Sequence, residues 1–113
     1  MKIVNNTIAI KEIKTMAENM FGDMLKAVVD VDRGIIAVDG ELHSDLEALL
    51  LYRGSKQKDL WGINLYPEKT GSEFVEFDSL INIRPKHGNK IRGVDDRAVR
   101  SKISRIVTKK VKR

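Results

Sequence analysis

The chain of 113 residues contains no cysteine, only two prolines and only six aromatic side chains. The absence of cysteine excludes disulfide bonds, a thiolate nucleophile and zinc held by cysteine. Charged residues make up 33% of the chain and interrupt its apolar stretches, so we expect no contact with a membrane. No apolar stretch of signal-peptide length follows the first residues. We therefore expect a cytoplasmic protein whose stability comes from packing.

Motifs for the common cofactors and nucleophiles are also missing. Gly34 and Gly40 stand alone, and neither belongs to a phosphate-binding loop that leads a strand into a helix. The serines lie in no glycine elbow, and His43 and His87 are the only imidazoles that could act as bases. The sequence therefore predicts no cofactor and favours a protein that is not an enzyme.

What the chain does have is an uneven distribution of charge. Residues 1–78 carry nine Lys and Arg against fourteen Asp and Glu, a net charge of −5. Residues 79–113 carry twelve against two, a net charge of +10. A basic segment of this kind can bind nucleic acid, anionic lipid or an acidic protein. It can equally neutralise the acidic part of the same chain, and the sequence leaves both interpretations open.

Hydrophobic periodicity predicts two helices in a single domain of residues 1–113. Apolar residues over 10–21 recur at spacings of three and four, and Gly22 follows where a helix ends. The last segment of the chain has the same periodicity, with Asp95 as its N-terminal cap. We expect the apolar stripe of each helix to pack on a sheet.

Alternating apolar and polar residues predict strands over residues 25–31, 35–38, 60–66 and 74–84, the last being the longest. The first two flank Asp32-Arg33-Gly34, which is typical of a hairpin turn. Residues 46–52 are ambiguous, because Ser44 and Glu47 have the spacing of a helix capping box. Their short apolar run favours a buried strand.

Short turns between strands favour antiparallel neighbours, and two one-sided helices need one sheet face to cover. We therefore predict an α+β fold, a two-layer sandwich. Its mainly antiparallel sheet of about five strands carries the N-terminal and the C-terminal helix on one face. The other face would remain open and polar.

This open face offers one candidate site. An enzyme acting on a small or phosphorylated substrate could use its side chains together with His43. A polar sheet face without function, exposed to water, explains the same pattern. The candidate residues are Asn64, Tyr66, Asp78, Asn82 and Arg84.

A second pattern is the acidic run from Asp39 to Glu47. Asp39, Glu41, His43, Asp45 and Glu47 alternate, and in an extended segment they would share one side. Such a cluster could bind a hard cation or supply an acid and a base. A solvated acidic loop accounts for it equally well, and we assign no metal.

The clearest signal in the sequence is a concentration of basic residues. Basic residues crowd the loop that begins at residue 84, and on the outer face of the last helix arginines alternate with hydroxyl groups. Arginine side chains beside hydroxyl groups suit phosphate oxygens. We therefore expect a non-enzymatic binding module that contacts an anionic partner, RNA or DNA, through this loop and helix. The residues assigned to that contact are Arg84, Lys86, Lys90, Arg92, Arg97, Arg100 and Arg105.

A third alternative is an oligomerisation or accessory protein. It would expose an apolar patch around Leu80 and Phe74. The sequence leaves the oligomeric state open.

Three stretches of the chain together show a likeness to one known family. They are residues 59–67 (DLWGINLYP), 77–85 (FDSLINIRP) and 88–95 (GNKIRGVD). They resemble a family of small prokaryotic proteins that is described only as a domain of unknown function. The resemblance covers nearly the whole chain. It implies a cytoplasmic, stand-alone bacterial or archaeal domain, and it implies no activity, cofactor or site.

Overall fold

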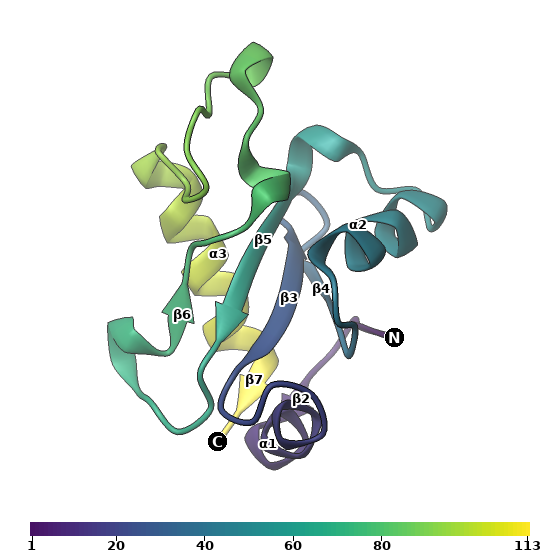
Figure 1. Ribbon diagram of the computed structural model, residues 1–113, viewed down its shortest axis with the longest axis vertical. Helices are drawn as coiled ribbons and strands as arrows, with labels where there is room; N and C mark the ends of the chain where they lie inside the picture. The colour runs from purple at the N-terminus through teal and green to yellow at the C-terminus, as the bar shows by residue number, and fades with distance from the viewer.

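Five strands form the central sheet of the computed structural model, which describes residues 1–113 (Figure 1). Their order across the sheet is β1-β4-β3-β5-β6, and every neighbouring pair runs antiparallel. The strands are β1 (Lys2–Val4), β3 (Leu25–Asp30), β4 (Ile35–Val38), β5 (Leu60–Leu65) and β6 (Val75–Glu76). The predicted α+β class and the antiparallel sheet of five strands are confirmed.

Two of the three helices cover one face of the sheet, as predicted. They are the N-terminal helix α1 (Ile10–Glu18) and the C-terminal helix α3 (Arg97–Lys110). Ile13 of α1 and Ile103 of α3 are fully buried in the larger apolar cluster, together with Ile63 of β5. No helix combines the length and the hydropathy that crossing a membrane requires.

A second, two-stranded sheet connects these two helices. β2 (Ile8–Ala9) directly precedes α1, and β7 (Val111–Lys112) directly follows α3. The two strands pair in parallel. The beginning of α1 is thereby tied to the end of α3.

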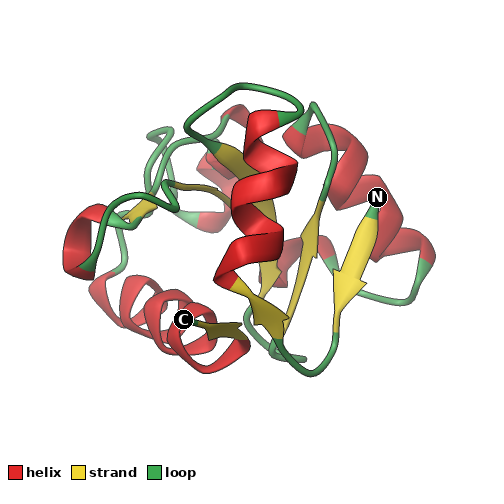
Figure 2. Cartoon of the chain, turned by 90° about the horizontal axis from the view of Figure 1, so that it is seen from below, coloured by secondary structure: helices red, strands yellow, loops and turns green.

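The third helix, α2 (His43–Tyr52), includes residues 46–52, for which the prediction of a strand is wrong. Leu46 and Leu50, four positions apart, are fully buried against Val28 of β3, while Tyr52 is 86% exposed. The uninterrupted apolar run conceals this helical spacing. Because α2 lies on the side of the sheet opposite α3 (Figure 2), it covers part of the face expected to be open.

The predicted long strand over residues 74–84 is also wrong, since only β6 belongs to the sheet. At Ser79 the side-chain oxygen accepts a backbone N–H at the start of a 3₁₀ turn, η3 (Leu80–Asn82). Ser79 crosses close to Gly62 of β5, where an added Cβ would lie 2.5 Å from the Cβ of Ser79. Glycine at this position allows the close crossing.

The side chain of Asn82 makes the hydrogen bonds to β5 that a neighbouring strand would otherwise make. Its Oδ1 accepts the N–H of Gly62 at 2.8 Å, and its Nδ2 donates to the carbonyl oxygen of Gly62 at 2.9 Å. The same Nδ2 donates to the carbonyl oxygen of Arg92 at 2.9 Å. Asn82 is fully buried, and it therefore attaches both η3 and the following loop to β5.

The loop that follows is ordered by a second buried asparagine, Asn89. Its Oδ1 accepts the N–H of Asp95 at 2.9 Å, which sets the start of α3. The cap of α3 is Asp96 and not Asp95, because Asp96 Oδ1 accepts the first free N–H groups of the helix. Asn89 Nδ2 lies within 3.0 Å of three carbonyl oxygens, those of Asn82, Ile91 and Gly93.

We predict that Asn82→Ala lowers the free energy of unfolding by about 3 kcal/mol, because it leaves two buried backbone groups of Gly62 without partners. Urea unfolding followed by the fluorescence of Trp61 measures this. Asn6→Ala, at an exposed asparagine, is the control and should change stability by less than about 0.5 kcal/mol. Equal stability of the two variants would show that the Asn82 contacts carry no net free energy.

Candidate functional site

The basic residues predicted to contact nucleic acid differ in how many contacts their side chains make with other parts of the protein. Arg100 is half-buried, and its Nη1 donates to the backbone oxygens of Val94 at 2.5 Å and Asp95 at 3.2 Å. These contacts hold the chain that enters α3. Its guanidinium group is therefore partly occupied by the fold.

Arg84 is engaged in a different way, against an aromatic ring, and its Nε and Nη2 are buried without a hydrogen-bond partner. Its guanidinium carbon lies 4.2 Å from the centre of the Trp61 ring, and its Nη1 donates to the backbone oxygen of Gln57. Burial lowers the pKa of Arg84, while the negative charges of Glu47 and Asp59 oppose that shift. Arg84 thus joins the end of the sheet to the loop after α2.

The other basic residues of this set face solvent. Lys86 and Lys90 lie in the loop, and Arg97 and Arg105 lie on α3; all four are exposed. Arg92 is exposed as well, but its Nε lies 2.6 Å from Asp78 Oδ1, and this ion pair raises the pKa of Arg92.

The pattern of ion pairs bears on the two interpretations of the basic segment. The four ion pairs in the structure are Lys2–Glu12, Lys14–Glu68, Lys58–Asp59 and Arg92–Asp78. Only the last involves a basic residue of segment 79–113. Direct pairing with the acidic part of the chain therefore neutralises one of twelve cations.

The turn between β3 and β4 brings a further arginine to α3. Asp30 is buried, and its Oδ1 accepts the N–H groups of Asp32 and Arg33, both at 2.9 Å, which fixes the turn. Arg33 Nη1 donates to the backbone oxygen of Arg53 at 3.0 Å and to Ser55 Oγ at 3.1 Å. The Arg33 guanidinium is thereby held at the C-terminal end of α2, and Arg33 also lines a hollow next to α3.

Between this turn and α3 lies a hollow of about 280 Å³, which we call the cationic hollow. Gly34 and Ile106 line it together with four cations, Arg33, Arg105, Lys109 and Lys110. No acidic side chain lines it. Of these cations only Arg105 belongs to the set predicted from the sequence to contact nucleic acid. The spacing of Arg105 and Lys109, four apart on one helix, signals a shared face, but nothing in the sequence places Arg33 there.

The residues assigned to the open sheet face separate into two places. Asn64 Nδ2 donates to Glu76 Oε1 at 2.8 Å, and the Tyr66 hydroxyl donates to the same oxygen at 3.0 Å. Asp78 is adjacent, with its backbone oxygen 3.5 Å from Asn64 Nδ2. Asn82 and Arg84 lie elsewhere, on Gly62 and on Trp61, so the five residues do not converge on one centre.

The acidic run from Asp39 to Glu47 is not extended, which overturns the expectation that its side chains share one side. Asp39 has a positive φ of 67°, and α2 begins at His43. No group of three His, Asp or Glu side chains is placed to hold a metal ion. His43 is buried instead, with Nε2 2.8 Å from the backbone oxygen of Ile63.

The apolar patch expected around Leu80 and Phe74 is divided. Leu80 is 67% exposed, and Ile83 and Ile91 of the same loop region are also exposed. Phe74 is buried, at 5% exposure. The two residues therefore do not form one exposed surface.

Comparison with known proteins gives one match. Residues 2–110 match a family described as a protein of unknown function, DUF5674. The chain belongs to this family. Searches of curated proteins and of solved structures found no match. The resemblance noted in the sequence is thus confirmed over nearly the whole chain, and membership of DUF5674 brings no activity or site with it.

His43 makes stability depend on pH. Burial lowers the pKa of His43 from its ordinary value of 6.5. The unfolded chain therefore binds a proton at this residue at higher pH than the folded protein does. We predict that the free energy of unfolding falls as the pH drops below about 6.5, and that the fall levels off below the folded-state pKa.

Urea unfolding of wild type and His43→Gln at about pH 7.5 and about pH 5.5 measures this effect. The variant should lose less stability on acidification than the wild type. His87→Gln, which removes the exposed histidine, is the matched control and should behave as wild type. An unchanged pH dependence in His43→Gln would contradict the assignment.

Proposed function

We propose that the protein is a non-enzymatic module that binds the phosphate backbone of RNA or DNA through α3. The observation that carries the proposal is the cationic hollow, which four basic residues and no acidic residue line. Arg33 and Lys110 also donate to backbone oxygens of Arg53 and Asn5, so Arg105 and Lys109 are the two cations of the hollow without a partner in the chain. Like charges held together repel each other, and a phosphate group placed between them relieves that repulsion. Arginine and lysine together also supply the donors that phosphate oxygens accept.

The contact extends along α3 beyond the hollow. Arg97, Ser101, Arg105 and Lys109 follow one another at intervals of four, and all are exposed. Residues at this spacing lie on one side of a helix. The stripe from Arg97 to Lys109 is about 18 Å long at 1.5 Å per residue, which is enough to reach several phosphates of one strand.

The side chains available favour backbone contact over reading of bases. Trp61 is buried beneath Arg84, and Tyr66 is engaged by Glu76. Exposed cations and hydroxyls on α3 recognise phosphate, which all sequences share. We therefore expect binding that is sensitive to salt and largely independent of sequence.

We predict that Arg105→Gln/Lys109→Gln weakens binding to a fluorescein-labelled single-stranded RNA and to a DNA duplex alike. The slope of log affinity against log salt should become shallower by about two, one for each cation removed. Fluorescence anisotropy titrations at several salt concentrations measure both quantities. No residue of the hydrophobic core is changed, so the fold should be retained.

The matched control is Lys11→Gln/Lys56→Gln, which removes the same charge from two exposed lysines of α1 and of the segment after α2. It should leave the salt slope unchanged within about 0.5. Equal losses in both double variants would mean that only net charge matters. Wild-type protein that binds neither nucleic acid at low salt would refute the proposed function.

A further inference from the structure

A larger cavity lies on another side of α3 and is chemically different from the cationic hollow. It measures about 650 Å³ and opens between α3–β7 and the segment from the 3₁₀ turn η2 (Gly71–Glu73) to Phe77. That size lies in the range of sites for small molecules. The two sites share no lining residue.

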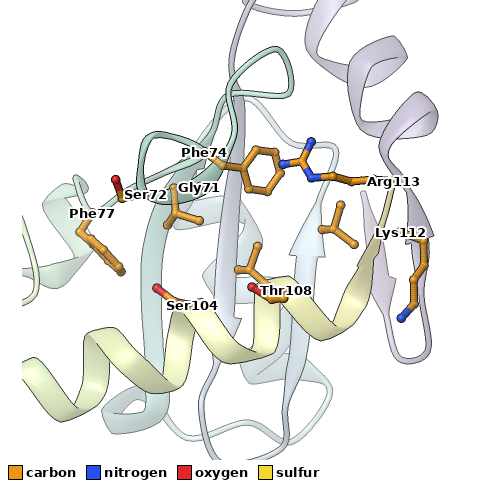
Figure 3. A pocket seen from close by; sticks show the side chains of 11 residues that line it. Gly71, Ser72, Phe74, Phe77, Ser104, Thr108, Lys112 and Arg113 are labelled. Atoms are coloured by element: carbon orange, nitrogen blue, oxygen red, sulfur yellow. The ribbon is translucent and has the colours of Figure 1, made fainter.

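Five of the eleven residues that line this cavity are apolar. Phe74 and Phe77 come from the segment around β6, and Val107 and Val111 come from the end of α3 and from β7. Figure 3 shows the two phenyl rings apart from each other, with Ser104 and Thr108 of α3 directed toward the space along the helix side. The cavity therefore suits an elongated apolar body with hydroxyl groups along one side.

Two cationic residues, Lys112 and Arg113, line one end of the cavity. The guanidinium group of Arg113 lies 4.6 Å from the centre of the Phe74 ring, and Lys112 points away from both rings (Figure 3). Arg113 Nη2 makes a long contact of 3.4 Å with the backbone oxygen of Lys69, and no partner occupies Nε or Nη1. No acidic side chain lines the cavity. A planar guanidinium with free donors matches a carboxylate in geometry and in charge.

We infer that this cavity binds a monocarboxylic acid with an elongated apolar body. The carboxylate pairs with Arg113 beside Phe74, and the apolar body extends over Val107 toward Phe77. A single guanidinium facing the cavity balances one negative charge, which favours a monocarboxylate over a phosphate dianion. This site is separate from nucleic-acid binding and holds or fails independently of it.

The test uses octanoate as the probe, octanamide as its uncharged analogue and acetate as the acid without an apolar body. Titration into ¹⁵N-labelled protein should give saturable amide shifts at Gly71 to Phe77 and at Ser104 to Arg113. We expect a dissociation constant for octanoate of about 1 mM or lower, and binding by octanamide about tenfold weaker. Acetate should produce no saturable shifts there.

Two variants separate the charge from the cavity. Arg113→Gln should weaken octanoate about tenfold and leave octanamide unchanged, whereas Arg97→Gln, on α3 outside the cavity, should change neither. Ser104→Phe places a ring in the middle of the cavity and should weaken binding of both, and Ser101→Phe, on the same helix outside the cavity, should weaken neither. These positions are exposed, so the variants should fold, which the dispersion of their amide spectra checks.

Three outcomes would overturn the inference. Octanoate and octanamide could bind equally well, which would show that Arg113 does not pair with the carboxylate. Ser104→Phe could bind octanoate like the wild type, which would place the ligand elsewhere. Shifts spread over the whole surface without saturation would mean that octanoate has no defined site on this protein.

Discussion

The pairing of Asn82 with Gly62 is the contact on which the second half of the structure depends. β6 is only two residues long, so the chain leaves the sheet early and would otherwise have little to hold it against β5. The carboxamide of Asn82 satisfies the N–H and the C=O of Gly62 and also reaches the carbonyl oxygen of Arg92. Buried backbone groups that lack a strand must find another partner, and here a side chain is that partner.

Asn89 carries this attachment on to α3. Its Nδ2 donates to carbonyl oxygens of the loop, and its Oδ1 accepts the N–H of Asp95, the residue before the helix cap Asp96. The position of α3 over the sheet is therefore set by two buried asparagines as well as by Ile103 in the core. Both proposed sites lie on α3, so both depend on these polar contacts outside the apolar core.

Sequence patterns correctly predicted the segments in which the apolar residues follow either the helical or the strand periodicity, but not both. The hairpin of β3 and β4 and the two terminal helices follow from alternation and from spacings of three and four. The failures have physical causes. Residues 46–52 are so apolar that a helix and a strand look alike, and residues 77–84 alternate like a strand while Ser79 and Asn82 turn the chain away. A side chain that replaces strand pairing leaves no periodic signal.

The candidate surface was only partly predictable for a related reason. Arg97 and Arg105 follow from the outer face of a predicted amphipathic helix, and both are exposed. Arg33 reaches the cationic hollow from a distant turn, which only the folded chain brings beside α3. Arg84, by contrast, lies over Trp61. Sequence identifies a basic residue, but it does not say which basic residues the fold itself engages.

The uneven charge of the chain persists in the folded protein. Segment 79–113 makes one ion pair with the acidic part, so most of its positive charge remains directed outward. The molecule extends 37 × 29 × 24 Å, whereas charges in water are screened beyond about 8 Å at physiological ionic strength. A phosphate close to α3 therefore interacts with the nearby cations far more strongly than with carboxylates across the molecule. The acidic part of the chain therefore does not cancel the attraction of a phosphate to the surface of α3. At lower salt concentration, the electrostatic interactions of both the positive and the negative charges would act over longer distances.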